Sequence, residues 1–123
     1  MPGSDRFRDG GGWEEPAGYS RGARRGNRIA ISGTTAEGDD AYAQAKAALE
    51  RAVVAVEALG GRREDILRTR LFLAPGADWE AAGRAHAELL GDIAPANTTI
   101  HVAELIGGYL VEVEIEAEIQ TES

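Results

Sequence analysis

The chain has 123 residues, of which 43% are hydrophobic, and this composition suits one domain with a real core. Its formal net charge of −8 at pH 7 repels phosphate backbones, so a nucleic-acid partner is not expected. Cysteine is absent, which excludes disulfides, thiolate nucleophiles and cysteine-ligated metals.

Residues 1–12 are rich in glycine and charge without hydrophobic periodicity, so we expect a mobile segment ahead of a single domain spanning 13–123. The segment lacks the apolar core of a signal peptide, and no apolar run reaches the ~18 residues of a membrane span. The expectation is a cytoplasmic protein with no membrane partner. Much of the hydrophobic content is alanine, which buries little area per residue, so we expect oligomerisation to add stability.

Two short strands are predicted first, over residues 18–23 and 27–33. The turn Arg25-Gly26-Asn27 joins them, and glycine and asparagine both tolerate the positive φ of a tight hairpin turn. Asp39-Asp40 then open a helix that runs to about residue 59, because carboxylates suit the positive end of a helix dipole. Its apolar residues recur at helical spacing and predict one buried stripe: Ala45, Ala48, Leu49, Ala52, Val56 and Leu59.

A third strand over residues 65–74 and a second helix over residues 79–90 follow, with Asp78 as the helix cap. The strand is expected to share one face among Leu67, Thr69, Leu71 and Leu73. The inner stripe of the helix is predicted to contain Trp79, Ala82, Gly83, His86, Leu89 and Leu90. A glycine inside a helix costs about 1 kcal/mol relative to alanine, which suggests that the sheet or a ligand approaches the backbone at Gly83.

Two final strands, over residues 98–105 and 109–119, complete the order β-β-α-β-α-β-β. This order predicts an α+β fold in which two helices cover one face of a mixed sheet. The last strand alternates between apolar residues and four glutamates, Glu112, Glu114, Glu116 and Glu118. A solvated face explains the last three, since neighbouring carboxylates repel and are costly to bury. One glutamate at the end of the row can instead turn inward and act as a base or orient water.

His86 allows two interpretations, a hydrogen-bonded residue at the core edge or a pocket ligand and proton donor. A metal site is not expected, because His86 and His101 are the only histidines and neither has a carboxylate at ligand spacing. The hydroxyl-rich stretch around Ser32, Gly33 and Thr34 either caps a strand end or offers its amides as a cradle for an anion or carbonyl.

Asn97-Thr98-Thr99 follows a proline turn and matches the N-glycosylation acceptor sequence N-x-[ST]. The stretch is either a surface glycan site or a set of polar side chains that line a pocket. The expected cytoplasmic location removes the glycan, which leaves the pocket wall.

Seven segments occur in order, at the separations of a known family, along residues 16–119: GYSRG, IAISGTT, VEALGG, DILRTRLFL, DWEAAGRAHAELLGD, PANTT and LVEVEIEA. Together they resemble the Rid family (YjgF-type, reactive intermediate deaminase). The resemblance implies a chorismate-mutase-like protomer and a homotrimer with pockets at the subunit interfaces. Deaminase members hydrolyse enamines and imines such as 2-aminoacrylate without a metal or cofactor, so no cofactor is expected.

By the same resemblance Tyr19 and Ser32 would be pocket residues, the Gly33 amide would approach the ligand, and Glu112 would position the attacking water. The family's deaminases read Pro-Ala-Arg where this chain has Asn97, and that arginine grips the substrate carboxylate with two parallel hydrogen bonds. They also commonly carry asparagine at the position of Gly83. The chain therefore resembles the subgroups without this arginine, in which 2-aminoacrylate deaminase activity is not expected.

The sequence therefore predicts a homotrimer that acts on a small imine, enamine or carbonyl metabolite by hydrolysis or tautomerisation. Catalysis is assigned to Glu112 and His86. Substrate binding is assigned to Tyr19, Ser32, Gly33, Thr34, Asn97, Thr98 and Thr99. The alternative is a non-catalytic trimer that binds or senses a small molecule. The sequence leaves open whether Arg21 or Arg84 replaces the missing arginine, and the acidic charge disfavours the endoribonuclease label sometimes attached to the family.

Overall fold

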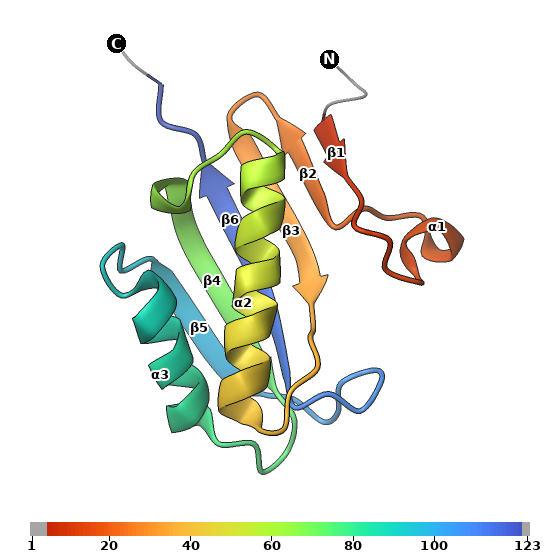
Figure 1. Ribbon diagram of the computed structural model, residues 1–123, viewed down its shortest axis with the longest axis vertical. Helices are drawn as coiled ribbons and strands as arrows, with labels where there is room; N and C mark the ends of the chain where they lie inside the picture. The colour runs from red at the N-terminus through yellow and green to blue at the C-terminus, as the bar shows by residue number, and fades with distance from the viewer. Residues whose placement is uncertain (1–4, 122–123) are drawn as a thin grey trace.

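The computed structural model describes residues 5–121, and its centre is a six-stranded sheet in the order β1-β2-β3-β6-β4-β5 (Figure 1). The strands are β1 (Arg6–Phe7), β2 (Gly22–Arg25), β3 (Arg28–Thr34), β4 (Ile66–Leu73), β5 (Ala96–His101) and β6 (Val111–Glu118). β5 runs parallel to β4, and every other neighbouring pair is antiparallel. The predicted mixed sheet is confirmed.

Two long helices, α2 (Ala41–Ala58) and α3 (Trp79–Leu90), lie side by side on one face of this sheet (Figure 1). Each begins at an aspartate whose carboxylate accepts a backbone N–H of the first turn, Asp40 for α2 and Asp78 for α3. The predicted alanine-rich stripe of α2 is buried against the sheet as expected. Within residues 5–121, the opposite face of the sheet carries no helix, and we call it the open face (Figure 1).

The hairpin between β2 and β3 turns through Gly26 and Asn27, as predicted, and Gly26 has a φ of 59°. β2 begins at Gly22 rather than at residue 18, because residues 14–17 form the short helix α1 (Glu14–Ala17). Gly18 ends that helix in the left-handed conformation, with a φ of 79°. β5 likewise covers Ala96–His101 instead of the predicted 98–105.

In the N-terminal segment, residues 5–12 make specific contacts with the rest of the domain. Arg6 and Phe7 pair with β2, Phe7 packs against the hydrophobic core, and the Asp9 carboxylate accepts hydrogen bonds from Arg51 at 2.7 and 3.1 Å. The contact of Asp9 with Arg51 joins residues 42 apart in the sequence, so a local pattern does not reveal it. Residues 1–4 lie outside the described part of the chain.

Two sets of predicted side-chain directions are wrong, one in the strand β4 and one in the helix α3. Leu67 is 56% exposed, because the register of β4 against β6 shifts between Ile66 and Arg68 and gives the buried position to Ile66. In α3, Trp79 is 59% exposed, and no atom lies within 4 Å of the place where a Cβ on Gly83 would stand. The sheet therefore does not approach Gly83, and the buried residues of α3 are Ala81, Ala82, Ala85 and Leu90.

Among residues 5–121, no helix combines the length and the apolar character needed to cross a membrane.

Candidate functional site

Glu112 lies on the open face directly against the backbone of Gly33. The alternation of β6 places Glu112 there, opposite the point where β3 loses its regular register between Ile31 and Thr34. A Cβ at Gly33 would overlap the Glu112 carboxylate, with Oε2 as its nearest atom. Glycine at position 33 is therefore what allows this carboxylate to rest on the strand.

Glu112 also differs electrostatically from the glutamates that follow it. Arg70 pairs with Glu114 at 3.4 Å and with Glu116 at 2.8 Å, and Arg28 lies 3.8 Å from Glu118. Within residues 5–121, Glu112 has no such partner. Burial and the nearby charge of Glu114 raise the pKa of the Glu112 carboxyl above its ordinary value, and Arg21 acts in the opposite direction. A half-buried carboxylate of this kind is suited to accept a proton.

Arg21 holds the end of β3 in place. Its Nη1 donates to the Gly33 carbonyl at 2.8 Å and to Thr34 Oγ1 at 3.3 Å, and its Nε lies 3.4 Å from the Asp9 carboxylate. Arg21 is buried, so its guanidinium is engaged inside the protomer. Thr34 is fully buried as well, and its hydroxyl donates to the Ser32 carbonyl at 2.7 Å, which gives it a structural position beneath the site.

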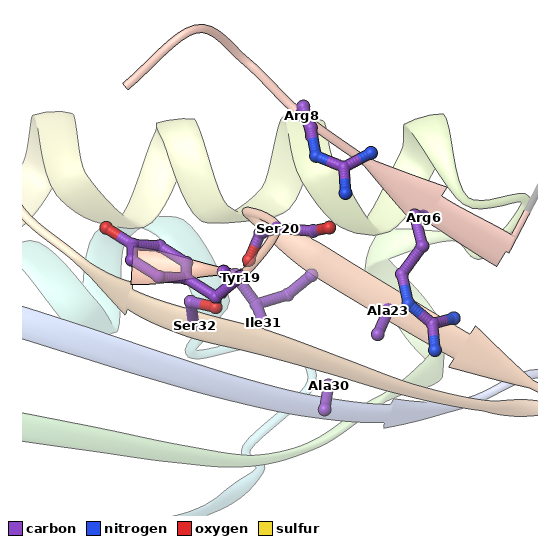
Figure 2. A pocket seen from close by; sticks show the side chains of 9 residues that line it. Arg6, Arg8, Tyr19, Ser20, Ala23, Ala30, Ile31 and Ser32 are labelled. Atoms are coloured by element: carbon purple, nitrogen blue, oxygen red, sulfur yellow. Dashed lines mark hydrogen bonds between the residues drawn. The ribbon is translucent and has the colours of Figure 1, made fainter. Parts of the chain in front are cut away.

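Tyr19 and Ser32 line a hollow of about 370 Å³, which we call the N-terminal hollow. Figure 2 shows it between the N-terminal segment and the strands β2 and β3. Its remaining lining residues are Arg6, Arg8, Gly18, Ser20, Ala23, Ala30 and Ile31. The Ser32 hydroxyl donates to the Ser20 carbonyl at 2.6 Å, so its oxygen can still accept a hydrogen bond. Because Ser32 precedes Gly33, the hollow adjoins the place where Glu112 rests.

A second group of polar side chains lies on the helix-covered face of the sheet, between β4, β5 and α3. His86 Nε2 lies 2.7 Å from Thr69 Oγ1, and Asn97 Nδ2 donates to the same oxygen at 2.9 Å. Thr99 Oγ1 in turn donates to Asn97 Oδ1 at 2.8 Å. Both ends of the Asn97 amide are thus bound within the protomer. Burial lowers the pKa of His86, which favours its neutral form.

This second group borders a cavity of about 470 Å³, the α3 cavity, lined by Leu73, Trp79, Gly83, Asn97, Thr99, Ile100 and His101. Gly83 therefore faces open space that could admit a ligand. Thr98 points the other way, onto the open face, with its Oγ1 3.4 Å from Arg68 Nη1.

One protomer does not bring the predicted site residues into a single pocket. Glu112, Gly33, Ser32 and Tyr19 gather at the end of β3, and His86, Asn97 and Thr99 gather beside α3. The sequence analysis did not assign Thr69 to the site, because Thr69 stands among the leucines of a strand predicted to be buried. It also did not assign Arg6 and Arg8, which line the N-terminal hollow. The alternation Arg-Phe-Arg was the available signal for a short strand carrying both arginines on one face.

Neither Arg21 nor Arg84 has a free guanidinium near these groups. These are the two arginines considered as replacements for the arginine that the family's deaminases carry at the position of Asn97. Arg21 is engaged as described, and the guanidinium of Arg84 lies over the Tyr42 ring, 5.1 Å from its centroid. Among the described residues, no three histidine, aspartate or glutamate side chains cluster closely enough to hold a metal ion.

The sequence model of a protein family described as Endoribonuclease L-PSP matches residues 13–119. The chain belongs to this family. The protein SCO2049 of Streptomyces coelicolor is 40% identical over 120 residues, which cover 91% of this chain and 90% of that protein. This comparison extends the family relationship over nearly the whole domain and agrees with the segments recognised in the sequence.

Two solved structures of family members show the same fold. The crystal structure of Rv2704 from Mycobacterium tuberculosis, a member of the YjgF/YER057c/UK114 family, is 35% identical with a TM-score of 0.89 and covers 93% of this chain and 98% of its own. YjgF from Escherichia coli is 24% identical with a TM-score of 0.79, covers 95% of each chain, and supports the fold alone. The Rid-type resemblance is thereby confirmed at the level of family and fold.

Proposed function

We propose that this family member acts on a small imine, enamine or carbonyl metabolite by acid–base chemistry in a pocket between the subunits of a cytoplasmic homotrimer. The observation that carries the proposal is Glu112. It is the one glutamate of its row without an arginine partner among the described residues, it lies against Gly33, and its pKa is raised. These are the properties of a carboxylate that holds a proton more readily than an ordinary glutamate does.

The separation of the polar residues into two groups supports a pocket between protomers. Glu112 and Ser32 lie at the end of β3, whereas Asn97 and Thr99 lie at the β5 edge. A small ligand cannot contact both the open face beside β3 and the helix-covered face at β5 within one protomer. It can contact both if the α3 cavity of one subunit lies opposite the N-terminal hollow of the next, which a closed ring of subunits provides.

In the proposed hydrolysis, Glu112 accepts a proton from water as the water oxygen bonds to the imine carbon. The protonated Glu112 returns this proton to the imine nitrogen. The hydroxyl proton of the adduct then moves to the same nitrogen as the C–N bond breaks, and the products are a carbonyl compound and ammonia or an amine. In a tautomerisation the same carboxylate would move a proton between carbon and nitrogen. Ser32 would accept a hydrogen bond from the ligand, and His86 would act through Thr69 and Asn97 on the other side of the pocket.

The 2-aminoacrylate reaction is not part of this proposal. Asn97 occupies the position of the arginine that grips the carboxylate in the family's deaminases, and its amide is bound to Thr69 and Thr99. An asparagine held in this way recognises a neutral partner at best. We therefore propose that the chain is similar to the subgroups that lack the arginine.

The test compares wild type with Glu112→Gln on a panel of imines and enamines generated in situ. Glutamine keeps the shape beside Gly33 but cannot accept the proton, so turnover should fall about 10²–10⁴-fold. Wild-type activity should also fall on acidification, as pH drops through the raised pKa of Glu112. Equal activity of the two proteins would remove Glu112 from catalysis. Ligand binding without any turnover would instead favour the alternative, a small-molecule-binding or regulatory trimer.

A further inference from the structure

Arg21 joins the N-terminal segment to the peptide on which Glu112 rests. Its Nη1 donates to the Gly33 carbonyl at 2.8 Å, and the Glu112 carboxylate lies against the same glycine. The Arg21 side chain is only 5% exposed, so little water screens its charge. A charge in such surroundings acts more strongly on its neighbours than a charge in water does. Both the position and the charge of Arg21 therefore bear on Glu112.

The segment between β1 and α1 encloses the Arg21 guanidinium. The Asp9 carboxylate lies 3.4 Å from Arg21 Nε and also binds Arg51 of α2 at 2.7 Å. Gly11 lies directly against both guanidinium groups, since a Cβ there would stand 3.1 Å from Arg21 Nη2 and 3.3 Å from Arg51 Nη2. The buried carboxylate of Glu14 accepts the backbone N–H groups of Gly11 and Arg21, each at 2.8 Å. These contacts hold Asp9 in place as the counter-charge of Arg21.

Few other charges face Glu112. Burial is the main reason that the pKa of Glu112 is raised, Glu114 on the same strand adds to it, and Arg21 opposes both. From β4, the uncharged Phe72 pairs with Glu112 in the ladder, and Arg70 is bonded to Glu114 at 3.4 Å. β3 meets Glu112 with the bare backbone of a glycine. Within residues 5–121, Arg21 is thus the cation whose charge acts on Glu112.

We propose that Arg21 is a positioning residue for Glu112 and that Asp9 controls how strongly Arg21 acts on it, so that the N-terminal segment regulates this carboxylate. The inference rests on the proposed function only in taking Glu112 as the reacting group. With Asp9 in place, part of the Arg21 charge is compensated, and Glu112 holds its proton more readily. Without Asp9, the uncompensated guanidinium favours the charged carboxylate.

An NMR titration of the Glu112 carboxyl carbon, in protein made with isotope-labelled glutamate, tests the inference without a substrate. Glu112→Gln identifies the signal, because that signal disappears in the variant. In Asp9→Asn the titration midpoint of Glu112 should move to lower pH, because Arg21 loses its counter-charge. In Arg21→Gln the midpoint should move to higher pH, because the cation that favours the carboxylate is gone. Arg21→Lys keeps that charge and should bring the midpoint back toward the wild-type value.

The direction of each shift separates this effect of charge from a merely structural one. A loosened N-terminal segment would give Glu112 more water, which alone would lower its midpoint in every variant. Arg51→Gln is the variant to use where the loss of the buried Arg21 prevents folding. It removes one anchor of the segment but leaves the Asp9 charge beside Arg21, so the midpoint should not fall.

The matched control is Asp92→Asn. It breaks another aspartate–arginine pair, in which two hydrogen bonds of 2.9 Å join Asp92 to Arg63. Asp92 is not among the groups that act on Glu112, so the Glu112 midpoint should stay at its wild-type value. Thermal melting shows which of the variants retain the fold.

A midpoint that stays in place or rises in Asp9→Asn would overturn the inference, as would one that falls in Arg21→Gln or Arg51→Gln. Failure of the proposed function is recognised separately, by turnover. Equal turnover of imines by wild type and Glu112→Gln would remove Glu112 from catalysis and leave the titration result intact. If imines are turned over, the acid limb of the activity profile should follow the NMR midpoint to lower pH in Asp9→Asn. An acid limb that stays in place while the midpoint moves would disprove the regulation of the reaction.

Discussion

Glu112 and Glu114 are two residues apart on one strand face, yet their surroundings give them different chemistry. Glu114 meets Arg70, whereas Glu112 meets the bare backbone of Gly33 and pairs laterally with Phe72. An arginine contact stabilises the charged form of a carboxylate, and partial burial without one destabilises it. The absence of one side chain, at Gly33, thus distinguishes the proposed base from its neighbours.

His86 offers a direct test of the hydrogen-bond chain beside α3. It is half buried, and burial lowers its pKa from the ordinary value of 6.5. In NMR titrations we expect its ring signals to change at a pH below 6.5. Because the unfolded chain then binds more protons than the folded one, stability should be complete above pH 6.5 and should fall as pH drops through the lowered pKa.

The control for this titration is His86→Gln. The shifted signal should vanish, and the melting temperature should depend less on pH between about 7 and 5, since the ordinary pKa of histidine lies in that interval. A His86 signal that titrates above 6.5 would contradict the buried, neutral histidine drawn here and with it the Thr69–Asn97 chain.

At the level of elements, the N-terminal segment depends on one carboxylate. Asp9→Asn removes the ion pair with Arg51 and leaves the buried Arg21 with a weaker partner. We expect a loss of about 1–3 kcal/mol in the free energy of unfolding and faster hydrogen exchange at the amides of Arg6 and Phe7. Asp39→Asn, at an exposed carboxylate next to the α2 cap, is the matched control and should change neither.

Acidification supplies a second measurement on the same element. The hydrogen bond from Arg51 holds the pKa of Asp9 below its ordinary value of 3.8. The stabilisation is therefore present above pH 3.8 and is lost as pH falls through the lowered pKa. Wild type and Asp9→Asn should become equally stable there. Slow exchange at Phe7 in Asp9→Asn at pH 7 would mean that strand pairing alone holds β1.

The elements also show what the sequence pattern could and could not predict. The α2 stripe and the Gly26-Asn27 turn were predictable, because each depends on local spacing and residue type. The exposure of Leu67 depends on a register shift against β6, a strand more than forty residues away in sequence. The segment after β1 is held by the contact of Asp9 with Arg51, which joins residues 42 apart in the sequence and is not visible in a local pattern. The division of the site residues into two groups has the same origin, since it follows from the strand order.

At the scale of the whole molecule, the open face of the sheet needs a cover. This face carries Phe72 and Ile100, and Ile100 is 46% exposed. Beside them lie the ion pairs of Arg70 with Glu114 and Glu116. The helices α2 and α3 cover the other face of the sheet. In a trimer the open faces of the three protomers would meet. Burying an arginine-glutamate pair that is already formed within a protomer costs less desolvation free energy than burying a single charge. We expect wild type to sediment at three times the protomer mass.

Ile100→Asp tests that arrangement, because an aspartate on this face would bury an unpaired charge between subunits. Sedimentation should shift toward the monomer, and imine turnover should fall with it if the pocket lies between subunits. Val54→Asp places the same charge at a somewhat more exposed position, 56% accessible on the outer side of α2, and should remain trimeric and active. A wild type that sediments as an active monomer would rule out the interfacial pocket. A trimer unaffected by Ile100→Asp would place the interface on another surface.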